Sequence, residues 1–180
     1  MGHRNIVLVG FMGTGKSTVG KILAKRLGRT WVDVDQRIEE AEKRKIGDIF
    51  EKDGEAGFRA LEKEMVRRVC GGANLVITTG GGAVLDEENM RALKQNGFLI
   101  ALDASPETIY QRVKDSRHRP LLKSGDLMGE IRRLLEARRP FYAKADVSFR
   151  TDGKTAADVA GAIAGALEKE EEFEFGKDWF

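Results

Sequence analysis

The sequence is poor in cysteine and has no long apolar run, and each of these absences excludes a class of protein. A single cysteine, Cys70, rules out an internal disulfide, and its place on an apolar helical face fits an ordinary core position. No apolar run approaches the roughly 18 residues that a membrane span needs. Residues 1–5 are too short and too polar for a signal peptide. We therefore expect a protein of the reducing cytoplasm that has no membrane partner.

The charge composition favours no charged macromolecule as a partner. Lys and Arg number 31 against 29 Asp and Glu, a net charge of +2, and no basic block is interleaved with aromatic residues, so we expect no nucleic-acid partner. The 180 residues, 41% hydrophobic and 33% charged, suit a single globular domain. We expect that domain over residues 1–170, with an acidic and aromatic tail at 171–180. Because no extended apolar surface stripe is visible, we expect a monomer.

The most informative stretch is the glycine-rich segment Gly10–Thr18, which has the spacing G-x-x-x-x-G-K-S. It follows the apolar run Ile6–Val9 and precedes a helical pattern at 19–27, and this context distinguishes a phosphate-binding loop from an ordinary tight turn. Glycines let successive N–H groups converge on phosphate oxygens, and the start of the helix adds its positive dipole end. Lys16 adds a charge for the outer phosphates, and Ser17 offers a hydroxyl to Mg²⁺.

Strands and helices alternate along the whole chain. The expected strands are 5–9, 31–35, 75–79, 98–102 and 147–149, and the expected helices are 16–27, 36–43, a short one near 46–50, 55–70, 86–95, 106–113, 126–139 and 155–169. Four of the five strands are near-continuous apolar runs, which indicates a parallel sheet covered on both faces. The prediction is an α/β fold of three layers, α/β/α, with a phosphate-binding loop, a five-stranded parallel sheet and a mobile lid at about 112–125.

Polar residues follow three of these strands, at the edge of the sheet where such folds bind ligands. They are the glycine loop, the pair Asp33 and Asp35, and the glycines 80–82. Asp33 and Asp35 alternate along the expected strand end, so their side chains should leave on the same side. They could hold metal-bound water and orient or deprotonate an acceptor hydroxyl, or one of them could cap the next helix. Asp86 is better explained as a helix cap than as the acid of a motor ATPase.

The residues alone leave the roles of the arginines open. Arg59 could lie on a solvated helix face, and Arg138 and Arg139 could simply interact with the negative end of their helix. Arg119 lies in the polar segment expected to form the lid, and a cation brought in by a closing lid would stabilise the charge of phosphoryl transfer.

Six motifs in order resemble the shikimate kinase family, of the nucleoside-monophosphate-kinase-like P-loop group, over roughly residues 4–165. They are G-F-M-G-T-G-K-S-T at 10–18, D-V-D at 33–35, G-F-R at 57–59, G-G-G at 80–82, R-P-L-L at 119–122 and R-R-P-F-Y at 138–142. The resemblance implies transfer of the γ-phosphoryl group of ATP to the 3-hydroxyl of shikimate, in the pathway to chorismate and the aromatic amino acids.

The resemblance also implies roles for individual residues. The implied ATP-binding residues are Gly13, Thr14, Gly15, Lys16, Ser17, Thr18, Arg112, Arg119 and Lys154. The implied shikimate-binding residues are Asp35, Arg59, Gly81, Gly82 and Arg138. Lys16, Asp35 and Arg119 are the implied catalytic residues. Mg²⁺ is the implied cofactor, bound by Ser17 and, through water, by Asp33.

Two questions about these roles stay open. Asp35 is either a base or an orienting group, and the offset from Pro140 favours Arg138 over Arg139 as the carboxylate ligand.

Three other interpretations remain. One is a kinase for gluconate or for a nucleoside monophosphate, although an Asp pair with two arginines favours a hydroxylated acid. Another is a regulatory or motor NTPase, although the guanine-binding string N-K-x-D is absent. The third is a binding module, which would have no need of Lys-Ser beside two carboxylates.

Overall fold

The computed structural model describes the backbone of residues 4–114 and 126–175, and side chains as far as residue 169. Arg119, most of the expected lid and the end of the C-terminal tail lie outside the described residues. The strands are β1 (Asn5–Gly10), β2 (Thr30–Asp33), β3 (Leu75–Thr78), β4 (Gly97–Asp103) and β5 (Val147–Arg150). The helices are α1 (Lys16–Leu27), α2 (Val34–Glu42), α3 (Ile46–Cys70), η1 (Ala83–Leu85), α4 (Glu87–Gln95), α5 (Pro106–Val113), α6 (Leu127–Tyr142) and α7 (Ala156–Phe175).

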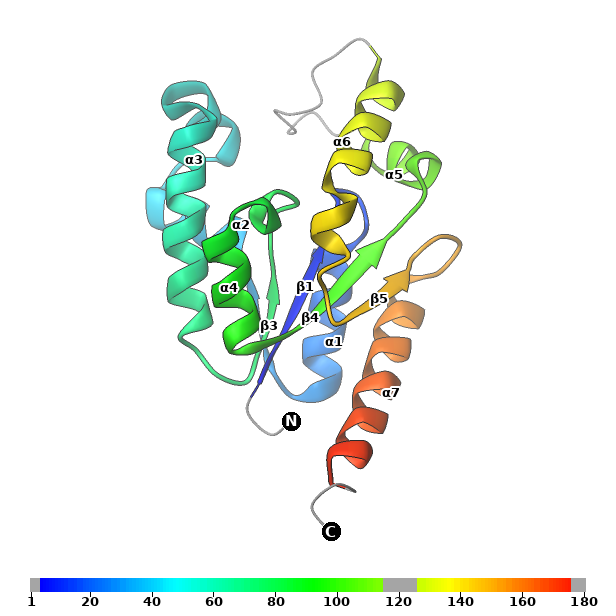
Figure 1. Cartoon of the computed structure of the whole chain (residues 1–180). Helices are drawn as coiled ribbons and strands as arrows, with labels where there is room; N and C mark the ends of the chain where they lie inside the picture. Colours follow the sequence, from blue (N-terminus) through cyan, green and yellow to red (C-terminus); the bar gives the residue numbers. More distant parts are fainter. Residues whose placement is uncertain (1–3, 115–125, 176–180) are drawn as a thin grey trace.

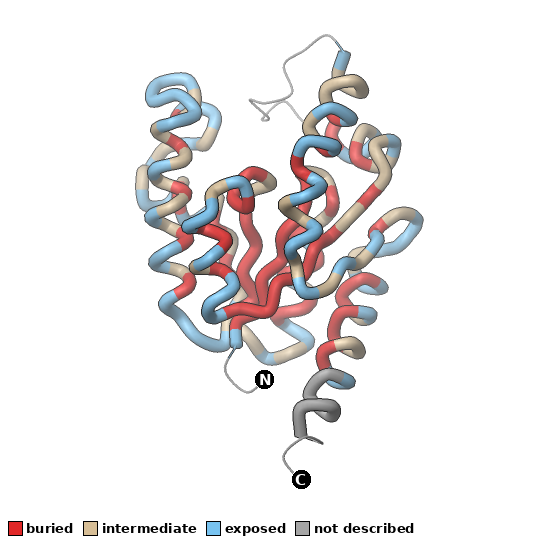
Figure 2. Tube along the Cα trace, viewed as in Figure 1, coloured by how far each residue is buried: buried red, intermediate tan, exposed pale blue. Residues whose placement is uncertain are grey.

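The five strands form one parallel sheet in the order β2-β3-β1-β4-β5, with helices on both faces (Figure 1). Successive side chains of β1 alternate between two cores. Ile6 and Leu8 pack with residues of α1 and α7, whereas Val7 and Val9 pack with residues of α3 and α4. Burial on both faces explains why the strand sequences are apolar without alternation, and Figure 2 shows the buried residues concentrated on the sheet. The predicted three-layer α/β/α architecture is confirmed.

No helix among the described residues combines the length and the apolar character that a crossing of the membrane requires.

The strand β2 ends earlier than the sequence predicts. Asp33 is the last residue of β2, and its side chain accepts a hydrogen bond from the Gln36 N–H at 3.1 Å, which caps α2. The helix therefore begins at Val34, and Asp35 lies in its first turn rather than on a strand. The expectation that Asp33 and Asp35 alternate along one strand is wrong, because the Asp33 cap starts the helix between them.

The helix α6 runs further than the sequence predicts. It continues through Pro140 to Tyr142 instead of ending near Arg139. Since Pro140 lies only two residues from the end of the helix, it interrupts the hydrogen bonding of the last turn alone. The Tyr142 hydroxyl donates to the Gly81 carbonyl oxygen at 2.6 Å, and this tertiary bond holds that turn in place. The last helix, α7, is also longer than expected and reaches Phe175.

The break that the sequence predicts at Asp53-Gly54 is present as a kink inside α3. Gly54 has φ 72° and ψ −179°, while the residues on both sides are helical. An added Cβ at Gly54 would meet no atom within 4 Å, so conformation rather than space requires glycine here. The kink separates a short outer helix from the long helix that carries Arg59.

We predict opposite effects for two Gly→Ala substitutions in sites with equally open space. Gly54→Ala should lower the free energy of unfolding by about 1–3 kcal/mol, because this backbone conformation is nearly restricted to glycine. Gly165→Ala, in α7, should raise it by about 0.5–1 kcal/mol, because alanine loses less entropy in a helix. Urea unfolding followed by circular dichroism measures both. A shift in the same direction for the two variants would contradict the conformational explanation.

Candidate active site

The glycine loop between β1 and α1 has the backbone that its sequence predicts. Gly13 and Gly15 have φ values of 80° and 94°, and Gly15 is the N-cap residue of α1. The Lys16 side chain folds back along the loop and donates to the carbonyl oxygens of Gly10 and Phe11, both at 2.9 Å. Its ammonium group is therefore held at the mouth of the loop, next to the first N–H groups of the helix.

Ser17 and Asp33 meet beside this loop, although 16 residues separate them in the sequence. Ser17 Oγ donates to Asp33 Oδ2 at 2.8 Å, and Thr78 Oγ1 donates to the same oxygen at 2.8 Å. The three residues come from the start of α1 and the ends of β2 and β3. Hydroxyl and carboxylate oxygens are the donors that Mg²⁺ prefers, so this set fits a magnesium site. The described residues contain no cluster of three or more His, Cys, Asp or Glu that could hold a metal on its own.

Asp35 occupies an unusual electrostatic environment. Its Oδ1 atom is buried and has no hydrogen-bond partner among the described residues, although the side chain as a whole is partly exposed. Burial raises the pKa of Asp35 to about 7, and repulsion from Asp33 and Glu62 acts in the same direction. Lys16 and Arg59 attract the carboxylate and limit the rise. A carboxyl group with this pKa can accept a proton near neutral pH.

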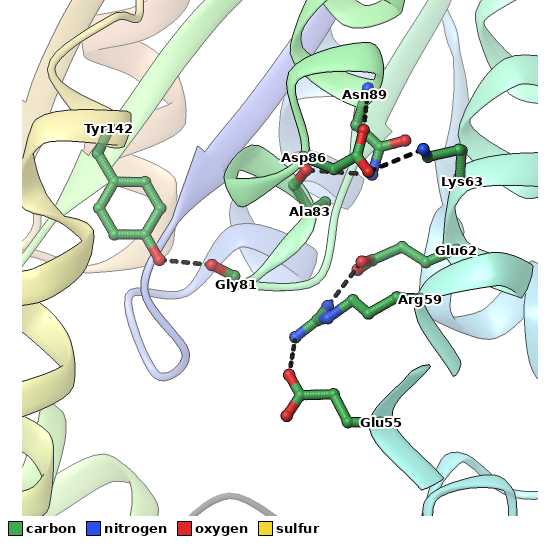
Figure 3. A network of polar contacts seen from close by, with 9 residues as sticks. All are labelled: Glu55, Arg59, Glu62, Lys63, Gly81, Ala83, Asp86, Asn89 and Tyr142. Atoms are coloured by element: carbon green, nitrogen blue, oxygen red, sulfur yellow. Dashed lines mark hydrogen bonds and ion pairs between the residues drawn. The ribbon is translucent and has the colours of Figure 1, made fainter. Parts of the chain in front are cut away.

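Arg59 lies between two glutamates on α3 (Figure 3). Its Nη1 donates to Glu62 Oε2 at 2.6 Å, and its Nη2 donates to Glu55 Oε1 at 3.1 Å. The Glu62 side chain is only 1% exposed, whereas that of Glu55 is 55% exposed. Arg59 is therefore anchored from the protein side and accessible from the solvent side. The possibility that it lies on a plain solvated face does not hold.

The glycines 80–82 are required for space and not for an unusual backbone. None of them has a φ in the left-handed region. A Cβ at Gly80 would lie 2.8 Å from Asp35 Oδ1 and 3.0 Å from Glu62 Oε1, and a Cβ at Gly82 would collide with the Arg59 guanidinium. A Cβ at Gly81 would lie 3.2 Å from the backbone nitrogen of Met12 in the glycine loop. The segment thus brings the Asp35 carboxyl, the Arg59 guanidinium and the glycine loop together.

Arg138 faces this same region from α6. Its side chain is buried, its guanidinium lies over the Phe11 ring at 5.7 Å, and its Nη1 has no hydrogen-bond partner among the described residues. The Arg139 side chain is 68% exposed, and its one ion pair among the described residues is a long contact of 3.7 Å with Glu136. Arg138, rather than Arg139, therefore has a buried guanidinium nitrogen available for a ligand.

Arg112 and Lys154 lie together at the other end of the glycine loop. Arg112 Nη1 donates to the Gly13 carbonyl at 3.1 Å and to Thr151 Oγ1 at 3.0 Å, and its Nη2 donates to the Thr151 carbonyl at 3.0 Å. The Lys154 N–H donates to the same carbonyl at 3.4 Å. These contacts join α5, the loop after β5 and the glycine loop into one wall.

The structure also reveals polar residues that the sequence reasoning did not single out, chiefly Glu62 and Tyr142. Glu62 occupies the same row of α3 as three buried residues, Phe58, Val66 and Cys70. A carboxylate in such an apolar row is a detectable signal, because a buried charge needs a partner. Tyr142 ends the motif R-R-P-F-Y, but the sequence gives no sign of its contact with a residue 61 positions away. The predicted helix cap at Asp86 is confirmed, since its carboxylate accepts from the N–H groups of Glu88 and Asn89.

Comparison with known proteins agrees with this arrangement. The family model for shikimate kinase matches residues 12–168. Shikimate kinases of Persephonella marina and Symbiobacterium thermophilum are 51% and 50% identical, and the alignments cover 91% and 92% of this chain and 99% and 97% of theirs. The solved structure of shikimate kinase from Acinetobacter baumannii in complex with shikimate superimposes with a TM-score of 0.91 at 38% identity, over 93% of this chain and 94% of that one.

A gluconokinase of Sinorhizobium meliloti has a TM-score of 0.59 at 18% identity, covering 96% of this chain and 97% of that one, and this likeness concerns the fold alone. The family model matches most of the chain, and the relatives are about half identical over nearly their whole length. The chain belongs to the shikimate kinase family.

Proposed function

We propose that this protein transfers the γ-phosphoryl group of ATP to the 3-hydroxyl of shikimate and so produces shikimate 3-phosphate, on the pathway to chorismate and aromatic amino acids. The observation that carries the proposal is the meeting of Arg59, Arg138 and the Asp35 carboxyl beside a phosphate-binding loop. Shikimate is a compact acid with several hydroxyl groups, so it needs cations for its carboxylate and a hydrogen-bond acceptor for its hydroxyls.

The nucleotide lies along the glycine loop in this proposal. The loop residues Gly13, Thr14, Gly15, Lys16, Ser17 and Thr18 bind its phosphates, and Arg112 and Lys154 border its base. Ser17 and, through water, Asp33 would hold Mg²⁺, which neutralises charge on the outer phosphates when bound. Support comes from the converging hydroxyl and carboxylate oxygens of Ser17 and Asp33 and from the contacts of Arg112 with the loop.

The acceptor lies on the other side of the γ-phosphate. The Arg59 and Arg138 guanidinium groups bind its carboxylate together with the Gly81 and Gly82 backbone, and Asp35 faces its hydroxyls. Because the Asp35 carboxyl has a pKa near the working pH, it can accept the proton of the attacking hydroxyl as well as orient it. Alignment of the two substrates and neutralisation of phosphate charge supply most of the rate enhancement in this type of reaction.

We propose roles for the remaining parts of the chain as well. Residues 1–170 act as one domain, and a lid at about 112–125 closes over the nucleotide and brings Arg119 onto the phosphates. Lid closure excludes water, which competes with the substrate hydroxyl as acceptor. We further propose that the protein acts as a monomer in the cytoplasm, on small molecules and without nucleic acid or a membrane.

The function is tested by measuring ADP release with Mg²⁺ and ATP in the presence of shikimate, gluconate, AMP or no acceptor. We expect release with shikimate only. Comparable rates with gluconate or AMP would favour a different kinase on the same scaffold, and release independent of an acceptor would favour an NTPase.

Two neighbouring arginines on α6 give a matched test of the carboxylate site. Arg138→Ala should raise the shikimate KM by about 10- to 100-fold, because a buried cation opposite the substrate is lost, and should leave the ATP KM nearly unchanged. Arg139→Ala should change neither constant by more than about twofold, because exposed ion pairs contribute little. Steady-state kinetics with each substrate varied measures both variants. Loss of ATP affinity with intact shikimate affinity in Arg138→Ala would contradict the assignment.

The raised pKa of Asp35 leads us to expect a pH-dependent reaction rate. Since its carboxylate is the active form and its pKa is raised to about 7, kcat/KM for shikimate should fall as the pH is lowered through about 7. Asp35→Asn should remove this ionisation and lower kcat by about 10²-fold or more if Asp35 is a base. A decrease of less than tenfold with the pH profile unchanged would reduce Asp35 to an orienting group.

A stability measurement checks the same pKa without substrate. The Asp35 carboxyl ionises near 3.8 in the unfolded chain and near 7 in the folded protein, so the folded protein holds an extra proton between these values. The wild type should therefore lose stability relative to Asp35→Asn as the pH rises from about 4 to 7. A constant difference across this range would show that the pKa is not raised.

A further inference from the structure

Tyr142, at the end of α6, makes a contact that the proposed function does not assign. Its hydroxyl donates to the Gly81 carbonyl oxygen at 2.6 Å, across 61 residues of sequence (Figure 3). Burial raises the pKa of Tyr142 to about 12, against the charges of Arg138 and Arg59 and a polar contact of its hydroxyl with the Arg138 side chain, so the hydroxyl keeps its proton near neutral pH. The hydrogen bond to Gly81 links α6 to the glycine segment.

The geometry of the peptide unit between Gly81 and Gly82 relates the direction of the Gly81 carbonyl to that of the Gly82 N–H. Because a peptide unit is planar and trans, its carbonyl oxygen and its N–H hydrogen point to opposite sides. Tyr142 approaches Gly81 from the α6 side, whereas Arg59 approaches from the α3 side, as Figure 3 shows. A bond that fixes the Gly81 carbonyl toward α6 therefore directs the Gly82 N–H toward α3. The Arg59 guanidinium is next to residue 82 on this α3 side, since a Cβ built on Gly82 would collide with it.

The same end of α6 supplies a second group to this region. Arg138 and Tyr142 are four residues apart and thus lie one above the other on a single helix face. The buried Arg138 guanidinium sits over Phe11 of the glycine loop, while Tyr142 holds the segment that packs against the backbone of Met12. The C-terminal end of α6, which continues past Pro140, therefore positions both the Arg138 guanidinium and the Tyr142 hydroxyl.

We propose that Tyr142 is a positioning residue that aims the Gly82 N–H, through its hydrogen bond to the Gly81 carbonyl, at the substrate carboxylate held by Arg59. This inference rests on the proposed function, since it assigns Tyr142 a part in the binding of the carboxylate. Tyr142 does not touch the reacting atoms. Its loss should weaken the binding of the carboxylate and leave the nucleotide site intact.

The test is Tyr142→Phe, which removes only the hydroxyl. The shikimate KM should rise about 3- to 10-fold, the cost of one hydrogen bond, while kcat and the ATP KM change by less than about twofold. Tyr110→Phe, at the only other tyrosine of the chain, is the matched control and should leave all three constants unchanged.

A substrate analogue separates positioning from a general structural effect. An analogue with a hydroxymethyl group in place of the carboxylate should inhibit the wild type and Tyr142→Phe with equal affinity, because the aimed N–H has lost its anionic partner. Equal weakening of shikimate and of this analogue, or a lower melting temperature with an unchanged shikimate KM, would overturn the positioning role. A wild type with no shikimate-dependent ADP release would instead overturn the proposed function, and this inference with it.

Discussion

The ion pair between Arg59 and the buried Glu62 is the interaction on which the rest of the site depends. Removing one partner of such a pair typically costs about 3–5 kcal/mol, because a charge is left buried without compensation. The pair fixes the guanidinium from the protein side, so that its other face remains available to a ligand. The position of this pair also explains two glycines next to it. A Cβ at residue 82 would collide with the Arg59 guanidinium, and a Cβ at residue 80 would lie against the Glu62 and Asp35 carboxyl groups.

The carboxylates of this site differ in how far the protein itself supplies their partners. Asp33 is tied to Ser17 and Thr78, and Glu62 is tied through Oε2 to Arg59. Asp35 Oδ1 and Glu62 Oε1 are buried and have no hydrogen-bond partner among the described residues. Burial raises the pKa of Asp35 to about 7, and repulsion from Asp33 and Glu62 adds to the rise, while attraction by Lys16 and Arg59 limits it. A carboxyl group with a raised pKa and two guanidinium groups therefore lie together at this edge of the sheet.

The sequence predicted what local patterns determine. The glycine loop, the five strands, four of them apolar runs, the break at Gly54 and the Asp86 cap follow from spacing and turn chemistry, and all are present. The sequence could not place features that depend on distant contacts. Asp35 lies on a helix because Asp33 caps it, α6 continues past Pro140 to the turn that Tyr142 holds against Gly81, and Glu62 is buried because Arg59 neutralises it.

The central claim is that one edge of the sheet binds a hydroxylated acid by its carboxylate, opposite a nucleotide. The most direct measurement is a crystal structure of the protein with shikimate and a non-hydrolysable ATP analogue. The account predicts the shikimate carboxylate within hydrogen-bond distance of both Arg59 and Arg138, with a hydroxyl facing Asp35 and the γ-phosphate beside Lys16. A carboxylate bound elsewhere, or shikimate hydroxyls on the two arginines with the carboxylate in solvent, would contradict it.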